Sequence, residues 1–101
     1  MPDGVLAALT PPVPDWPEDL PQVLYIDHFG NAITGLRAER IGRDTRLRIG
    51  GAILAYARTY SEVRAGEGFW YENANGLAEI AVNQARASDQ LGIAVGDSVG
   101  V

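Results

Sequence analysis

The sequence predicts a mainly β protein, a small barrel-like or sandwich-like domain with one short helix. Three observations predict this fold. Short apolar runs rich in branched and aromatic residues recur from residue 22 to the end of the chain. Turn residues separate these runs, and Asn75-Gly76 is among the strongest short hairpin signals. One segment, residues 84–91, has helix formers between an asparagine and a glycine.

The amino-terminal segment differs sharply in composition from the rest. All six prolines lie within residues 1–21. Because proline fixes φ and removes a backbone donor, residues 1–21 are expected to form a linker or lead-in. Residues 22–101 are expected to form one folded domain, since a chain of 101 residues suffices for one core and not for two.

The elements follow in order along the chain. The expected strands cover residues 22–27, 31–36, 46–51, 52–63 as one bent strand or two, 68–73, 76–82 and 97–101. A weaker signal for one helical turn lies at 37–42. The helix at 84–91 is expected to begin after an N-cap at Asn83 and to end at Gly92, because asparagine caps helix starts and glycine follows helix ends.

Composition excludes several classes of function. The chain has no cysteine and one histidine, so we expect no disulfide and no metal site built from Cys or clustered His. The net charge of −5 argues against a nucleic-acid partner. No run approaches the roughly 20 apolar residues that cross a bilayer, and the first residues lack the basic start of a signal peptide. A cytoplasmic protein that does not bind membranes is therefore expected.

Two polar turns are candidate sites. In "YIDHFGNAITG", residues 25–35, Asp27 and Asn31 flank a tight bend. The structural interpretation is that Asp27 binds backbone N–H groups while Phe29 joins the core. The functional interpretation is a ligand rim that offers a carboxylate, an amide and an aromatic face. The residue pattern alone favours the structural interpretation.

The second candidate is "NANGLAEIAVN", residues 73–83. The structural interpretation is that Asn75 forms the hairpin turn and Asn83 caps a helix. Functionally, exposed N–H groups at a helix start and side-chain amides can meet the edge of a purine.

The aromatic residues and the histidine are less specific. Most of the aromatic group is expected in the core, and one ring at a rim could stack on a flat heterocycle; the group comprises Tyr56, Tyr60, Phe69, Trp70 and Tyr71. His28 is expected at the surface, with a general-base role as the alternative.

Three stretches in order resemble one family. They are "VLYIDHFGNAITGL", "RTYSEV" and "GFWYENANGLAEIAVNQARASDQLGIAVGDSVGV". Together they resemble the C-terminal domain of the S-adenosyl-L-methionine (SAM) hydroxide adenosyltransferases, which are related to the fluorinase and chlorinase. The resemblance covers residues 22–101, and it is specific only when the stretches are taken together.

The resemblance implies a β-barrel-like domain that follows a larger α/β domain in a homotrimer. SAM or adenosine would lie between the N-terminal domain of one subunit and the C-terminal domain of the next. Water would attack the 5′ carbon of the ribose and release adenosine and L-methionine, with no cofactor and no metal. The family's Asp-Arg-His set lies in the N-terminal domain, so no catalytic residue is expected in this chain. The chain could be a separately produced domain or a natural fragment. In either case the chain alone is expected to be inactive.

The resemblance also implies ligand contacts for eight residues. They are Asp27 near the methionine ammonium, Phe29 and Asn31 at the adenine, Tyr60 as a stacking ring, Ala74 and Asn75 at the methionine end, and Asn83 and Gln84 at the adenine edge.

Two departures from the family pattern bear on the reaction. Ala74 stands where the family usually has serine, which removes a hydroxyl at the methionine end. Asn75 stands where the halogenating branch has arginine, and the extra residue of that branch between the acid and the phenylalanine is missing. The pattern therefore favours water as the nucleophile. The alternatives are the same domain of a SAM-dependent halogenase, or a stand-alone binding or interaction module.

Overall fold

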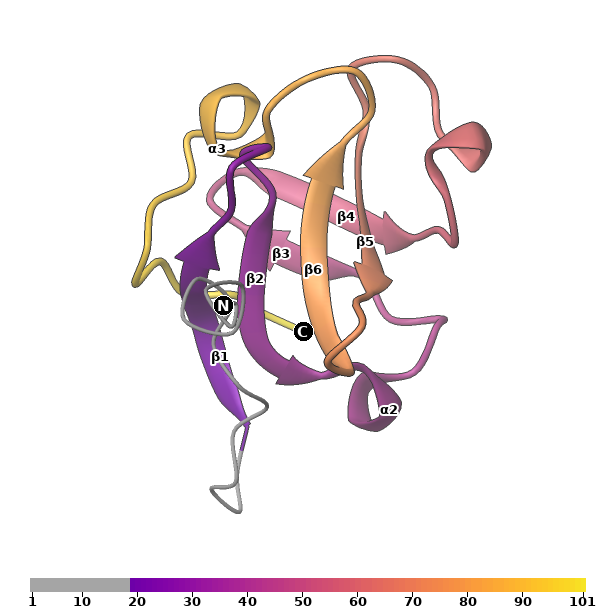
Figure 1. Ribbon diagram of the computed structural model, residues 1–101. Helices are drawn as coiled ribbons and strands as arrows, with labels where there is room; N and C mark the ends of the chain where they lie inside the picture. The colour runs from indigo at the N-terminus through magenta and orange to yellow at the C-terminus, as the bar shows by residue number, and fades with distance from the viewer. Residues whose placement is uncertain (1–18) are drawn as a thin grey trace.

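The computed structural model describes residues 19–101, and these form one curled six-stranded sheet with the order β1-β2-β6-β5-β4-β3 (Figure 1). The strands are β1 Leu20–Ile26, β2 Ala32–Arg37, β3 Leu47–Ile49, β4 Ala52–Tyr56, β5 Gly68–Glu72 and β6 Leu77–Val82. The expected mainly β fold is confirmed. Most of the expected lead-in, residues 1–18, lies outside the described residues, and Leu20 and Pro21 belong to β1.

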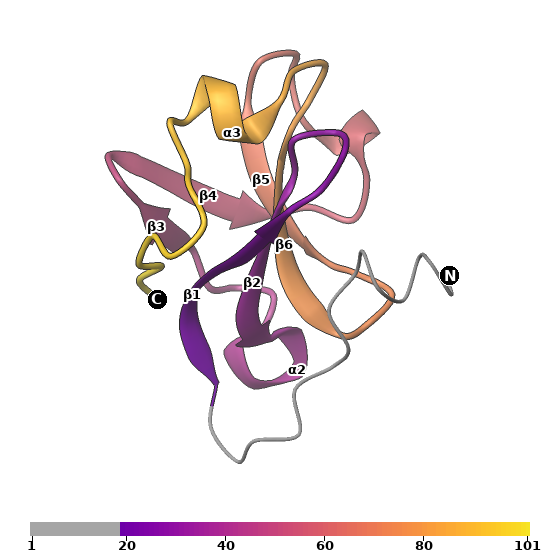
Figure 2. The same cartoon turned by 60° about the vertical axis from the view of Figure 1, so that its left-hand side comes forward.

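The C-terminal segment joins the two edges of the sheet. Ser98 pairs with Gln22 of β1. Gly100 pairs with Arg48 of β3 through N–H···O bonds of 2.7 and 2.8 Å. Figure 2 shows this segment, in yellow, descending from α3 past β1 to β3. The expected strand at 97–101 is therefore a pair of isolated bridges, because its neighbours lie on different edges of the half-barrel.

The main core fills the inside of the half-barrel. Trp70 is fully buried there, and its indole Nε1 donates to the carbonyl of Thr45 at 2.9 Å. The fully buried apolar side chains packed around it include Val23, Leu47, Ile80 and Val82. β6 is buried along its whole length, since its other face is also covered.

A parallel pair interrupts the antiparallel sheet. β4 ends at Tyr56 and pairs in parallel with β5, so residues 57–67 must cross over between the two strands. The crossover contains the 3₁₀ turn Tyr60–Glu62, which Thr59 caps by accepting the N–H of Ser61. The expected strand at 52–63 therefore ends early. The crossover covers a second small core of Ala57, Phe69 and Ala81 on the outer face of the sheet.

The two helices are short. The helical turn expected near 37–42 is present as α2, Ala38–Ile41, and the helix expected near 84–91 is present as α3, Ala87–Gln90. Gly92 follows α3 with φ +65°, and the N–H of Ile93 bonds to the carbonyl of Ser88 at 3.0 Å, as expected after a helix end.

The expected cap at Asn83 is wrong. The N-cap of α3 is Arg86, without a side-chain cap bond. Asn83 and Gln84 instead form a separate turn, in which the N–H of Ala85 bonds to the carbonyl of Val82 at 3.3 Å. This turn ends β6 before the helix begins, so Asn83 lies too far back to cap it.

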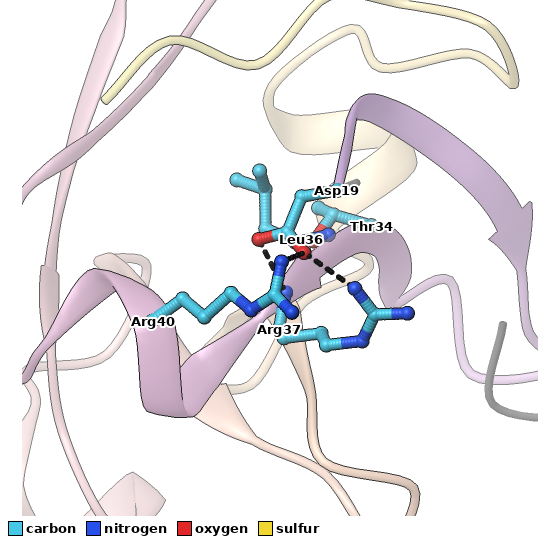
Figure 3. Close-up of polar contacts among 5 residues, drawn as sticks. All are labelled: Asp19, Thr34, Leu36, Arg37 and Arg40. Atoms are coloured by element: carbon cyan, nitrogen blue, oxygen red, sulfur yellow. Dashed lines mark hydrogen bonds and ion pairs between the residues drawn. The ribbon is translucent and has the colours of Figure 1, made fainter. Parts of the chain in front are cut away.

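Asp19 fixes the start of β1 against the end of β2 (Figure 3). Its carboxylate accepts the backbone N–H of Arg37 at 3.2 Å and the Arg37 guanidinium at 2.9 Å, and Arg40 lies 3.5 Å away. Within residues 19–101, no helix is long and apolar enough to cross a membrane.

Candidate functional site

The turn between β1 and β2 is built by Asp27. Its Oδ1 accepts the backbone N–H groups of Phe29 at 2.9 Å and Asn31 at 3.0 Å. Gly30 has φ +81°, and a Cβ there would lie 2.6 Å from the Cβ of Arg86. Only glycine fits this bend. The structural interpretation of Asp27 as a turn-forming acid is confirmed, whereas its contact with a methionine ammonium stays a prediction.

The side chains that follow Asp27 point outward. Phe29 is 72% exposed, so its expected placement in the core under the structural interpretation is wrong. It lies on a tight turn, where the backbone bonds to Asp27 direct the ring away from the sheet. His28 is exposed as expected, and its ring meets Phe29 edge-on at 5.3 Å. This leaves an aromatic face open beside Asn31.

Three loops gather at one end of the half-barrel. They are the 27–31 turn, the 82–86 loop after β6 and the crossover after β4, and Figure 1 shows them together at the top of the sheet. An open pocket of about 410 Å³ lies among them, lined by Phe29, Asn31, Tyr60, Val82, Gln84 and Ala85. This volume falls within the range of small-molecule sites. Four of the eight residues suggested by the resemblance therefore line one pocket.

Asn83 contributes to this end of the domain as a tether. Its Nδ2 donates to the carbonyls of Tyr60 at 3.3 Å and Val63 at 2.8 Å. These bonds hold the crossover against the end of β6. Tyr60 is 44% exposed and lines the pocket, and its ring meets Phe69 edge-on at 5.2 Å. Asn83 thus holds a candidate stacking ring in place.

A buried polar cluster lies beneath the pocket, centred on Glu79 of β6. Glu79 is 6% exposed, and it faces Ile33 and Tyr71 across the neighbouring strands. Its carboxylate accepts from the amides of Asn31 at 3.3 Å and Asn73 at 3.2 Å, and from the hydroxyl of Tyr71. A buried carboxylate needs such donors, since burial of an unpaired charge is strongly unfavourable.

Tyr71 is held as a hydrogen donor. Its burial, followed by its hydrogen bond to Glu79 and the negative charge of that residue, raises the pKa of Tyr71 well above its ordinary value of 10.0. Weaker contributions in the same direction come from Tyr60 and Asp27. The hydroxyl therefore remains protonated at any physiological pH.

This shift predicts a loss of stability in alkali. Because the pKa of Tyr71 is higher in the folded state, its contribution is fully present below pH about 10 and is lost as the pH rises above that value. We expect the free energy of unfolding to fall by at most about 1.4 kcal/mol for each further pH unit. Denaturant unfolding between pH 8 and 11 measures this. Tyr71→Phe should flatten the decline and Tyr56→Phe should retain it; equal declines in wild type and Tyr71→Phe would contradict the assignment.

Ala74 and Asn75 lie elsewhere. They occupy the hairpin turn between β5 and β6, where the N–H of Asn75 bonds to the side chain of Asn73. The six residues of β6 separate this turn from Asn83, roughly 20 Å at the rise of a strand. The structure does not bring these two residues to the pocket, and Asn73 links their turn to the buried cluster through Glu79.

Sequence reasoning missed the roles of Glu79 and Asn73, and it treated Tyr71 only as a member of the aromatic group. The signal was present, because Glu79 is a single charged residue within the apolar run "GLAEIAV". A carboxylate inside a buried strand requires partners, and its neighbours across the strands are the first place to look.

Fold and pocket define a class of protein: a small β half-barrel domain with an open, aromatic-rimmed pocket at one end. Among residues 19–101 no group of three or more His, Asp or Glu side chains is placed to hold a metal ion. The six residues that line the pocket offer stacking faces and hydrogen-bonding groups, which suits recognition of a flat polar ligand.

Comparison with known proteins identifies the family. Residues 21–100 match the model of the SAM hydroxide adenosyltransferase C-terminal domain. The chain belongs to this family and corresponds to that domain.

Similar proteins agree in sequence and in fold. The (R)-S-adenosyl-L-methionine hydrolase of Thermus thermophilus is 36% identical over 96 residues, 95% of this chain and 36% of that protein. That of Salinispora arenicola is 34% identical over 103 residues, 97% of this chain and 39% of that protein. The crystal structure of a conserved hypothetical protein from Thermus thermophilus superposes with a TM-score of 0.73 at 35% identity, covering 99% of this chain and 41% of that one. This chain therefore spans well under half of the length of each.

Proposed function

We propose that this chain is the nucleoside-binding part of a SAM hydroxide adenosyltransferase. In the reaction, a water oxygen bonds to the 5′ carbon of SAM while the bond from that carbon to sulfur breaks. The electron pair stays on sulfur, so L-methionine leaves, adenosine forms and a proton passes to solvent. The observation that carries this proposal is the convergence of Phe29, Asn31, Tyr60 and Gln84 on one pocket in a chain of this family.

The pocket supports a role at the adenosyl end. Its exposed rings, Phe29 and Tyr60, can stack on a purine, while the amide of Asn31 can bind a purine edge. Contacts of Asp27, Ala74 and Asn75 with the methionine end stay predictions, as does a direct contact of Asn83 with adenine. No cofactor is needed for the proposed reaction.

We further propose that the pocket is completed by an α/β domain of a neighbouring subunit in a homotrimer. The large exposed fraction of Phe29 and Tyr60 supports this, because covering aromatic rings is favourable. The lone domain would then bind ligand weakly, since one face of the ligand stays in water while association still costs several kcal/mol. The cytoplasmic location expected from the sequence stays a prediction.

The halogenase alternative is less well supported. The turn from Asp27 to Asn31 is closed by two backbone N–H bonds to Oδ1 of Asp27, and it lacks the extra residue that the resemblance gives to the halogenating branch. The alternative of a stand-alone binding module shares the pocket and differs only in the absence of a catalytic partner domain. Turnover of SAM by the chain mixed with the N-terminal domain of a family member distinguishes this module from the enzyme.

Replacing Asn31 by alanine tests the adenosine site. We expect the affinity for adenosine to fall by about 5- to 150-fold, the effect of losing a desolvated hydrogen bond worth about 1–3 kcal/mol. Calorimetric titration of the chain, alone and mixed with the N-terminal domain of a family member, measures this effect.

Gln90→Ala, which removes an exposed amide from α3, serves as the matched control and should bind as wild type does. Thermal unfolding of both variants reports any loss of fold. An Asn31→Ala protein that stays folded and binds adenosine with unchanged affinity would contradict the proposed site.

A further inference from the structure

Glu79 contacts both the pocket residue Asn31 and the hairpin residue Asn73. Its Oε1 accepts from Asn73, whereas its Oε2 accepts from Asn31 and from the hydroxyl of Tyr71. Both oxygens of Glu79 therefore act as acceptors, and each group that contacts them must present a hydrogen. Glu79 thereby imposes an orientation on each amide that it contacts.

Asn73 cannot turn its amide around. Its Oδ1 accepts the backbone N–H groups of Asn75 at 2.9 Å and Leu77 at 3.0 Å, which shape the β5–β6 hairpin. Its Nδ2 must therefore face Glu79, at 3.2 Å from Oε1. The hairpin fixes this end of the cluster and requires an acceptor at the Oε1 position.

Asn31 is oriented by Glu79 in turn. Its Nδ2 donates one hydrogen to Oε2 of Glu79 at 3.3 Å and the other to the hydroxyl oxygen of Tyr60 at 3.4 Å. Both amide hydrogens are thus used. Among residues 19–101, no buried side-chain nitrogen or oxygen lacks a hydrogen-bond partner. Oδ1 of Asn31 makes no such bond within this part of the chain, so this oxygen cannot be buried. Because Asn31 lines the pocket, Oδ1 is the acceptor that it offers there.

We propose that Glu79 is a positioning residue that makes Asn31 present an acceptor to the pocket. The site therefore selects a purine with a donor at its edge, such as the 6-amino group of adenosine, over the 6-oxo group of inosine. This inference rests on the proposed adenosine-binding function and adds a basis for its specificity. Glu79 acts only through Asn31, because it does not line the pocket.

The decisive variant is Glu79→Gln, which keeps the shape of the side chain and replaces one acceptor by a donor. Asn73 is fixed by the hairpin, so the glutamine must place its oxygen toward Asn73 and its NH₂ toward Asn31 and Tyr71. The hydroxyl of Tyr71 can rotate and accept from this NH₂, because a hydroxyl both donates and accepts. Asn31 must then turn its amide, accept from the glutamine and present its own NH₂ to the pocket. The preference for adenosine over inosine should disappear or reverse.

The experiment measures the dissociation constants of adenosine, purine riboside and inosine by calorimetry, with the chain mixed with the N-terminal domain of a family member. Wild type should bind adenosine more tightly than purine riboside, which has only hydrogen at position 6, and bind inosine least, with about tenfold or more between adenosine and inosine. Glu79→Gln should reduce this ratio to one or below. Glu72→Gln, an exposed glutamate on the same hairpin, should leave the ratio unchanged.

Each outcome is informative. A Glu79→Gln protein that weakens both nucleosides by the same factor shows a purely structural role and overturns the inference. If this variant does not fold, the wild-type series still decides, because equal binding of adenosine and inosine by wild type also overturns it. Failure of wild type to bind any of the three nucleosides instead contradicts the proposed function itself.

Discussion

Replacing Trp70 by alanine is expected to lower the free energy of unfolding by about 3–5 kcal/mol, the usual effect of removing a buried tryptophan. Trp70 is fully buried in the middle of β5, and its ring meets Tyr56 at 5.0 Å. Its indole also donates to the carbonyl of Thr45, at 2.9 Å, in the segment that leads into β3. The variant loses this packing, leaves a cavity and frees that carbonyl. For a domain of this size, such a loss is a large part of the total stability.

Chemical denaturation followed by circular dichroism measures this loss, because the variant also loses a tryptophan fluorophore. Trp70→Phe is the control, since it keeps one aromatic ring while it removes the bond to Thr45 and part of the buried ring surface. We expect it to cost about 1–3 kcal/mol. A Trp70→Ala protein within about 1 kcal/mol of wild type, well below the usual effect, would show that β5 does not depend on this side chain.

The local patterns predicted much of the fold because they depend on neighbouring residues. The Asn75-Gly76 turn and the glycine after α3 each act over a few residues, and each appears in the structure. The parallel pairing of β4 with β5 could not be predicted in this way. It depends on contacts between distant strands, and the crossover that it requires replaced the second half of an expected strand with a 3₁₀ turn.

Asn83 shows the same limit for a single side chain. An asparagine before a helical segment favours a cap, since its side chain can accept from the first helical N–H groups. In the structure, the side-chain amide of Asn83 instead donates to the carbonyls of Tyr60 and Val63. Whether Asn83 caps the helix or bonds to the crossover depends on where the crossover lies, and no local pattern contains that information.

The pocket was predictable only in part. Phe29, Asn31, Tyr60 and Gln84 followed from the family resemblance, and the structure brings them together. Glu79 was missed because the residue pattern drew attention to exposed polar turns, whereas this carboxylate lies inside a strand. The structure also shows why Asn31 serves the fold as well as the pocket: it satisfies part of a buried charge.

The chain alone is expected to release no adenosine from SAM above the rate in buffer. Activation of water requires a base within hydrogen-bonding reach of the reacting atoms. None of the six residues that line the pocket carries a carboxylate or an imidazole. Oδ1 of Asp27 is engaged by two backbone N–H groups, Glu79 lies beneath the pocket with three donors bound to it, and the exposed His28 does not line the pocket. We therefore expect the part of the chain that the structure describes to contribute to nucleoside binding, as proposed, and not to the activation of water.

Chromatographic detection of adenosine and L-methionine measures this turnover. We expect both products in equal amounts only when the chain is mixed with the N-terminal domain of a family member, because the proposed site then gains its second wall and the groups that activate water. The N-terminal domain alone is the matched control and should show far less turnover. His28→Ala and Asp27→Ala complete the set: release by the chain alone that either substitution abolishes would place the catalytic base in this domain. A mixture that binds adenosine and releases none from SAM would instead favour the stand-alone binding module.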